Sequence, residues 1–329
     1  MTFQILSLSG GGYLGLYTAT VLAGIERQIG RPIIDSFDMI AGTSIGGIIA
    51  LGLAAGKRAA DIAAAFEEAG PRIFGDSPPS RTAVSTFGRL MRGAGSPLYA
   101  PGPLRSAIEQ IVGSSTRMAD LVRPTVITAV NLSKGGPKIF KTGHHPSLML
   151  DWRLPAVEIA MATSAAPTYF PIHRIGGEMY ADGGMFANSP DLIAVHEAER
   201  FLGAERDEIS VLSIGTTTTA FAFSNSDGVD LGSVGWLKGQ RLTSAMIGSQ
   251  QAMTNDMMRH MFKDRYLRID RSQSHEHQRE LALDCASEAA TADLKAMAAS
   301  SLAEAMGSPN LAAMLAHRAP RFDFVNASL

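Results

Sequence analysis

The first part of the chain alternates between apolar runs and amphipathic runs. Residues 3–8 are apolar and predict a strand, residues 37–41 predict a second strand, and residues 59–68 predict a helix. Residues 45–54 are apolar on every side and predict a buried helix. One helical face is predicted after the first strand by the spacing of Leu14, Tyr17, Val21, Leu22 and Ile25. Strands and helices that alternate within 70 residues indicate an α/β fold with a mainly parallel sheet.

The rest of the chain follows this pattern less regularly. Residues 125–130 and 210–215 predict further core strands, and residues 154–162 predict a helix. Residues 75–103 are rich in proline and glycine, so we expect either a lid loop or a solvated connection there. We therefore divide the single domain into a catalytic core, residues 3–215, and a mainly helical C-terminal portion packed on it, residues 216–329. The methionine-rich helix at 240–262 is interpreted as core packing rather than as a binding surface.

Composition excludes several classes of protein. The 329 residues are 46% hydrophobic and 18% charged, which is typical of a folded globular protein. The net charge of -2 provides no basic field for DNA or RNA, so we expect no nucleic-acid partner. Cys285 is the only cysteine, and the start MTFQILSLSGGG lacks the features of a secretory signal. We expect a cytoplasmic protein that contacts a membrane only from its surface.

Two glycine-rich motifs suggest different chemistry. Residues 10–15, GGGYLG, match the G-x-G-x-x-G pattern of dinucleotide-binding loops, with Asp35 or Asp38 as the acidic residue for a ribose. Residues 42–46, GTSIG, match the G-x-S-x-G nucleophile elbow, in which a strained turn exposes a serine hydroxyl. The first motif predicts an oxidoreductase, whereas the second predicts an acyl hydrolase.

The order of residues along the second strand favours the hydrolase. Asp38 begins this strand, whereas Gly42 and Ser44 lie where it ends and a buried helix starts. The helix N-terminus would favour negative charge beside Ser44. Backbone N–H groups of Gly10, Gly11 and Gly12 could then stabilise the oxyanion of a tetrahedral intermediate, because no side chains block them. A dinucleotide-dependent oxidoreductase that uses Gly10–Gly15 stays as the alternative.

A serine nucleophile needs a base, and a carboxylate fits better than a histidine. All eight histidines follow Ser44, but none begins a loop after a convincing late strand. His275 and His277 lack further ligands, so we predict no metal and no cofactor. Asp182 ends a short strand and is followed by Gly183 and Gly184, which leave it uncrowded. Such a carboxylate can act as a base when it lies within reach of Ser44 in a site poor in water.

GGGYLG, GTSIG and DGG, in this order, resemble the motifs of the patatin-like phospholipases. ATSAAPTYFPIH and LALDCASEAA also resemble segments of that family. The resemblance implies a three-layer α/β/α fold with a mainly parallel central sheet, and a Ser-Asp dyad that hydrolyses acyl esters of lipids. By this likeness Ser44 is the nucleophile, Asp182 the base, and Gly10, Gly11 and Gly12 the oxyanion loop. The remaining motif glycines are Gly15, Gly42, Gly46, Gly183 and Gly184.

The first motif departs from the family pattern Asp-Gly-Gly-Gly-x-Arg-Gly at two positions. Ser9 stands in place of the aspartate and Leu14 in place of the arginine, which leaves open how the loop is held. A non-catalytic protein that binds lipid or nucleotide is therefore a further alternative. The stretch ILSLSGGGYLGLYTA also resembles bacterial patatin effectors of antiphage systems, which degrade membrane phospholipid when a cyclic oligonucleotide binds. That likeness implies a membrane phospholipid substrate and a cyclic-oligonucleotide activator, and it is compatible with a homo-oligomer.

Overall fold

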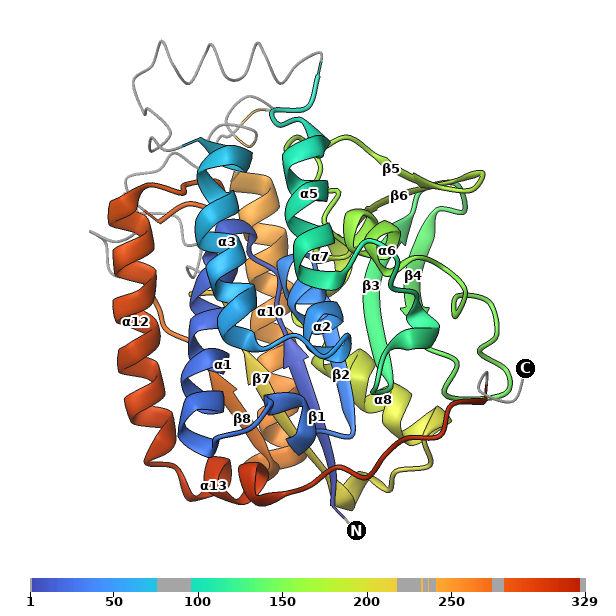
Figure 1. The fold of residues 1–329 in the computed structure, drawn as a ribbon, viewed down its shortest axis with the longest axis vertical. Coiled ribbons are helices and arrows are strands. Elements are labelled where there is room, and N and C mark those ends of the chain that lie inside the picture. The colour runs from blue at the N-terminus through green and yellow to red at the C-terminus, as the bar shows by residue number, and fades with distance from the viewer. Residues whose placement is uncertain are drawn as a thin grey trace.

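The protein is built around one mixed sheet of eight strands (Figure 1). The computed structural model describes residues 2–75, 96–217, 232, 236, 241–273 and 281–325. The strand order is β5-β6-β3-β2-β1-β7-β8, with β4 paired to β3. Strands β3, β2, β1, β7 and β8 are parallel, and β4, β5 and β6 pair antiparallel. The strands are β1 Phe3–Leu8, β2 Met39–Thr43, β3 Thr125–Asn131, β4 Gly136–Lys141, β5 His173–Ile175, β6 Glu178–Asp182, β7 Ile209–Ile214 and β8 Tyr266–Ile269.

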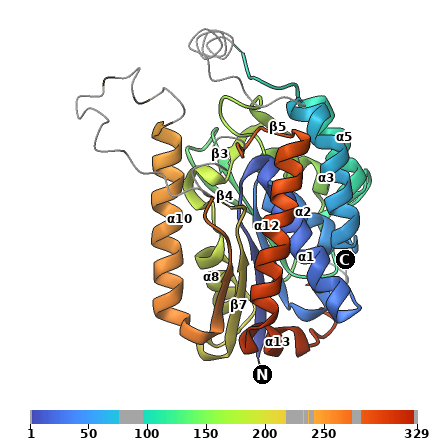
Figure 2. The same cartoon turned by 90° about the vertical axis from the view of Figure 1, so that its left-hand side faces the viewer.

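Helices cover both faces of this sheet and form the outer layers (Figure 2). One face carries α1 Gly15–Ile29, α2 Ile45–Ala54, α3 Ala59–Phe74, α5 Pro101–Val112, α6 Ala156–Thr163, α12 Glu288–Met306 and α13 Pro309–Ala316. The other face carries α8 Asp191–Phe201 and α10 Arg241–Phe262. The short helix α7, Gly184–Ala187, follows β6 and contacts α10. The predicted three-layer α/β/α fold is confirmed, with antiparallel strands at one side of the sheet.

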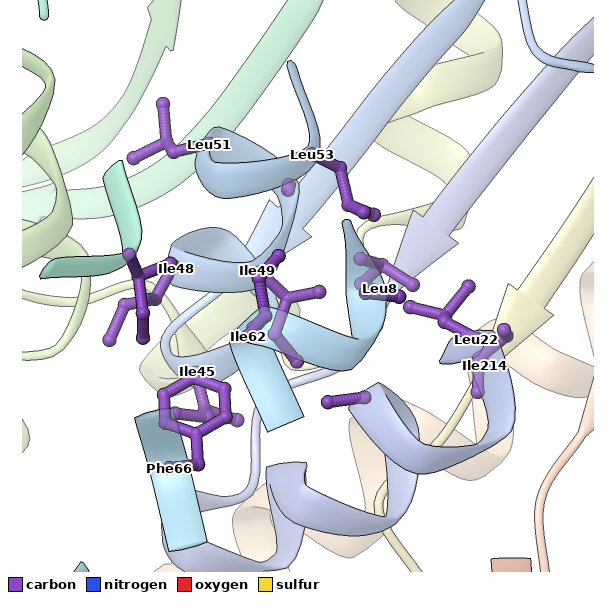
Figure 3. Packing of buried hydrophobic residues seen from close by; sticks show 14 of the residues in the cluster. Leu8, Leu22, Ile45, Ile48, Ile49, Leu51, Leu53, Ile62, Phe66 and Ile214 are labelled. Atoms are coloured by element: carbon purple, nitrogen blue, oxygen red, sulfur yellow. The ribbon is translucent and has the colours of Figure 1, made fainter. Parts of the chain in front are cut away.

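Helix α2 lies in the largest hydrophobic cluster and is buried along its whole length. Ile45, Ile48 and Ile49 pack there with residues of α1, α3 and the central strands (Figure 3). Burial of such side chains stabilises a fold by about 1.5–3 kcal/mol each, so the position of α2 is strongly determined. Because Ser44 directly precedes α2, its backbone is held in place by this core.

The C-terminal part of the chain contributes more to the sheet than its sequence indicates. Strand β8 pairs in parallel with β7 and was not predicted, because its four residues carry no clear alternation. The expectation that the α10 methionines are core packing is only partly right. Met258 is fully buried, but Met246, Met253 and Met257 are 55%, 57% and 43% exposed.

Two other expectations concern the loop and the membrane. Most of the loop predicted at 75–103, residues 76–95, lies outside the described residues, so its role as a lid stays a prediction. The boundary between a core at 3–215 and a helical portion at 216–329 also stays a prediction. Within the described ranges, no helix is both long enough and apolar enough to cross a bilayer.

Candidate active site

The pairing of β3 brings Ser44 and Asp182 together. Strand β4 pairs with β3 from Val126 to Asn131, so β2 and β6 must share the other edge of β3. Strand β2 occupies that edge up to Thr128, and antiparallel β6 occupies it from Ala129 onward. The two strands therefore end against each other. Ser44, just after β2, meets Asp182, the last residue of β6, although 138 residues separate them in the chain.

Ser44 lies in the strained turn that its motif predicts. Its φ of 53° and ψ of -125° are unusual for a residue with a side chain, and such strain is typical of functional sites. Its backbone N–H donates to Thr163 Oγ1 at 2.8 Å, which fixes the turn. A Cβ atom on Gly42 would collide with the Gly46 carbonyl group, and one on Gly46 would collide with the Leu8 carbonyl group. Both motif glycines are thus required by close backbone approach.

Asp182 is hydrogen-bonded to Ser44 and is buried. Ser44 Oγ donates to Asp182 Oδ2 at 2.6 Å, and the Gly184 N–H donates to Asp182 Oδ1 at 2.7 Å. Burial raises the pKa of Asp182 to about 6, and the two hydrogen bonds lower it in part. A carboxylate with this pKa is a stronger base than one in water, yet it is still ionised at neutral pH. Gly183 follows it closely because a Cβ atom there would collide with Thr128.

Histidines take no part in this arrangement within the described chain. Ser44 and Asp182 have no hydrogen bond to a histidine among those residues. Three buried or half-buried histidines pair with other carboxylates instead: His144 with Glu197, His173 with Glu158, and His317 with Asp38. The geometry therefore agrees with a carboxylate base.

The glycine loop lies beside Ser44, but its three N–H groups are not equivalent. A Cβ atom on Gly10 would lie 3.2 Å from Ser44 Cβ, which places the loop against the serine. The Gly10 N–H donates to the Asn188 carbonyl group at 3.0 Å, so it is not free for an oxyanion. Within the described residues, the N–H groups of Gly11 and Gly12 donate to no protein acceptor. The Gly10 N–H is therefore already engaged, and the role of Gly11 and Gly12 as oxyanion donors stays a prediction.

Several residues that hold the loop were not predicted. Thr216 Oγ1 and Asn188 Nδ2 donate to the Gly10 carbonyl group at 2.9 and 3.2 Å. The Tyr13 N–H donates to the Leu283 carbonyl group at 2.8 Å, just after the loop. Gly12 has a φ of 57°, and a Cβ atom on it would collide with that same carbonyl group. Leu283 lies in the family-like segment LALDCASEAA, and Asn188 lies shortly after the DGG motif, which are the only hints of their roles in the sequence.

The dinucleotide interpretation of the same loop does not fit the structure. The Asp38 carboxylate accepts the Gln4 N–H at 2.8 Å and pairs with His317. Gln4 lies at the start of β1, whereas the glycine loop follows the end of β1. An acidic residue for a ribose would have to lie at the carboxyl ends of the strands, where the loop lies. Asp38 lies beside Gln4 at the opposite, amino-terminal end of β1, so the alternative of a dinucleotide-dependent oxidoreductase is disfavoured.

Among the residues that the structure describes, no three His, Cys, Asp or Glu side chains gather as a metal site would require. His275 and His277 lie outside the described residues.

Comparisons with known proteins agree with the geometry. Residues 6–195 match the family model described as "Patatin-like phospholipase". Three curated relatives are each named "cGAMP-activated phospholipase". The one from Pseudomonas aeruginosa is 39% identical, covering 97% of this chain and 93% of its own. Those from Vibrio cholerae and Escherichia coli are both 37% identical, covering 88% and 89% of this chain and 88% and 86% of their own. The chain therefore belongs to the patatin-like phospholipase family, whose members are lipid acyl hydrolases.

Proposed function

We propose that this enzyme hydrolyses acyl esters of membrane phospholipids by a Ser44–Asp182 dyad and that a cyclic nucleotide switches it on. The observation that carries the proposal is the 2.6 Å hydrogen bond from Ser44 Oγ to Asp182 Oδ2 at the strained elbow. A nucleophile bonded to its base, at a strand-to-helix turn, is the arrangement that acyl transfer requires.

The first half of the reaction forms an acyl-enzyme. Ser44 Oγ attacks the ester carbonyl carbon while its proton moves to Asp182 Oδ2. The carbonyl oxygen becomes an oxyanion, which the N–H groups of Gly11 and Gly12 stabilise. Collapse of this intermediate breaks the bond to the leaving alcohol, and Asp182 returns the proton to that alcohol oxygen. The lysophospholipid leaves, and the fatty acyl group stays on Ser44.

The second half repeats these steps with water. Asp182 takes a proton from the water that attacks the acyl-enzyme, and the same N–H groups stabilise the second oxyanion. The bond to Ser44 Oγ then breaks, Asp182 returns the proton to Ser44, and the fatty acid leaves. No metal or cofactor is needed for either half.

A mainly apolar hollow beside the dyad supports a substrate with an apolar acyl group. Its volume is about 180 Å³, and its lining includes Leu104, Met161, Ser164, Ala165, Phe170 and Ile172, together with Arg105 and His173. The Ala165 carbonyl group accepts the Asp182 N–H at 3.0 Å, so the hollow adjoins the base. Apolar lining with few polar groups is typical of sites for apolar ligands.

Contact with the membrane surface is proposed for the outer face of α10. Leu242, Met246, Met253 and Met257 are exposed there, at spacings of one helical face. The same helix holds the active-site segment, because Gln250 Nε2 donates to the Gly184 carbonyl group at 2.7 Å. Apolar side chains on a helix favour burial at the boundary of a bilayer. Met253→Asp should reduce co-sedimentation with phospholipid vesicles, and unchanged binding would contradict this assignment.

Activation by a cyclic nucleotide is inferred from the relatives. All three are named for activation by cGAMP, and each aligns with more than four fifths of this chain. An enzyme that attacks membranes is harmful to its own cell unless it is regulated, and a nucleotide signal during infection would supply that regulation.

Covalent labelling tests the dyad without any lipid. A fluorophosphonate should label Ser44, as located by mass spectrometry of the digested protein, and Ser44→Ala should not be labelled. Addition of cGAMP, compared with a panel of other cyclic dinucleotides, should increase the labelling rate. A folded wild-type protein that resists labelling under every condition would favour the non-catalytic alternative.

A further inference from the structure

A buried arginine lies beneath the glycine loop. Arg268, on β8, has a side chain only 6% exposed. Its Nη1 donates to Ser9 Oγ at 2.8 Å and to Ser213 Oγ at 2.7 Å, and Ser189 Oγ, 3.4 Å from the same nitrogen, shares one of its two hydrogens. Its Nη2 donates to Asp270 Oδ2 at 2.7 Å. The forked guanidinium group can make these contacts at once, whereas a single ammonium group could not.

The contacts of Arg268 join both segments that flank the dyad. Ser9 directly precedes Gly10, and Ser189 directly follows Asn188, whose carbonyl group accepts the Gly10 N–H. The two serine hydroxyl groups are themselves 3.0 Å apart. The loop from residue 9 to residue 15 contains no charged side chain of its own. Arg268 therefore supplies the charge that holds it, from a strand more than 250 residues away.

A buried arginine at this position stabilises the fold less than an apolar residue of similar size would. Its Nε–H has no partner among the described residues, and an unsatisfied buried donor destabilises a fold. Burial lowers the pKa of Arg268, but attraction to Asp270 and Asp191 more than offsets this, so the group stays charged. Buried charges often add little net stability compared with apolar residues of similar size. Residues that reduce stability, such as this buried arginine, are expected where function requires them.

We propose that Arg268 is a positioning residue for the oxyanion donors. By clamping Ser9 and Ser189, it fixes the angle at which the loop presents the N–H groups of Gly11 and Gly12 to the reacting oxygen. Donors must be held rigidly to stabilise a transition state, and misplacement by about 1 Å can reduce a rate by about 10²-fold. This inference rests on the proposed function, because it assigns a support to that same oxyanion site.

The test measures hydrolysis and Ser44 labelling in four variants. Arg268→Gln should lower kcat by about 10²-fold with KM nearly unchanged, because ground-state binding does not use the oxyanion donors. Ser9→Ala should lower kcat by about tenfold, since it removes one charge-assisted hydrogen bond. Arg268→Lys should retain an intermediate kcat. The double variant Ser9→Ala/Arg268→Gln should be no slower than Arg268→Gln alone, because the contact that Ser9→Ala removes is already lost in Arg268→Gln.

Arg265→Gln is the matched control. Arg265 lies close by on the chain and donates to the Ile209 carbonyl group at 2.7 Å, but it has no contact with the loop. This variant should lower the melting temperature without changing kcat per labelled site. If Arg268→Gln fails to fold, Ser9→Ala and Arg268→Lys still decide the question.

The possible outcomes distinguish failure of the proposal for Arg268 from failure of the proposed function. Variants of Arg268 and Ser9 that label and hydrolyse within twofold of the wild type would overturn the clamp, even if their melting temperatures fell. A change confined to KM would also overturn it. By contrast, a Ser44→Ala protein that hydrolyses as fast as the wild type would refute the proposed function.

Discussion

Replacement of Asp182 by asparagine should stabilise the protein at neutral pH while it abolishes activity. The side chain keeps its size, and its Oδ1 atom can still accept the Gly184 N–H. It loses its negative charge, which burial disfavours in the folded state. Active sites often reduce stability in this way, because the catalytic group is held in an environment that does not suit it.

The expected gain in the free energy of unfolding follows from the pKa of the Asp182 carboxyl group. Burial raises that pKa from the ordinary value of 3.8 to about 6 in the folded protein. Between these values the folded state binds more protons than the unfolded state, so stability falls as pH rises. The full loss above pH 6 is about 3 kcal/mol, at 1.36 kcal/mol per pKa unit. Asparagine does not titrate, so Asp182→Asn avoids this loss.

Urea unfolding at pH 4 and pH 8 measures the effect. The free energy of unfolding of Asp182→Asn relative to the wild type should be about 2–3 kcal/mol higher at pH 8 than at pH 4. Ser44→Ala is the control, because it also removes activity but keeps the carboxyl group. Its pH dependence should be at least as steep as that of the wild type, since the Ser44 hydroxyl group lowers the pKa of Asp182.

The result that refutes this reasoning is simple. If Asp182→Asn and the wild type lose stability in parallel from pH 4 to pH 8, the pKa of Asp182 is not raised by burial. The carboxylate would then be an ordinary weak base, and its role as the base for Ser44 would need another source of basicity.

Three further predictions concern the same site. First, kcat/KM should rise about tenfold per pH unit below pH 6 and level off above about pH 7, because only ionised Asp182 can accept the proton; a flat profile from pH 5 to 8 would contradict this. Second, Thr163→Val should lower kcat and destabilise the fold by about 1–3 kcal/mol, because it leaves the Ser44 N–H without its acceptor; kinetics and urea unfolding measure both effects, and wild-type values would exclude the role of Thr163. Third, Gly12→Ala should reduce Ser44 labelling at least 10-fold, because the new Cβ atom meets the Leu283 carbonyl group at a positive φ; unimpaired labelling would show that this turn is not needed.

Much of the fold could be predicted because hydrophobic periodicity is a local signal. The apolar run 45–54 predicted α2 with its observed bounds, and residues 3–8 predicted β1 in the same way. Ser44 directly follows one strand and Asp182 is the last residue of another, and sequence patterns reveal such strand ends. That the two side chains meet depends on pairing along β3, which no local pattern contains.

The support of the site could not be predicted for the same reason. Arg268 lies in a strand of four residues, too short for an alternating pattern, and its serine partners are far away in the chain. The engagement of the Gly10 N–H with Asn188 is a backbone contact that leaves no trace in residue type. Departures from a family motif, at Ser9 and Leu14, pointed to a missing support but not to where its replacement lies. Leu14, which stands in place of the family's arginine, is a core residue and is 3% exposed.

The most direct test of the account is fatty-acid release from phospholipid vesicles by the wild type and by Ser44→Ala, each with and without cGAMP. We expect release by the wild type, greatest when cGAMP is present, and none by Ser44→Ala, which should retain its fold by circular dichroism. Equal release by both proteins would contradict the central claim that Ser44 is the nucleophile of a lipid acyl hydrolase.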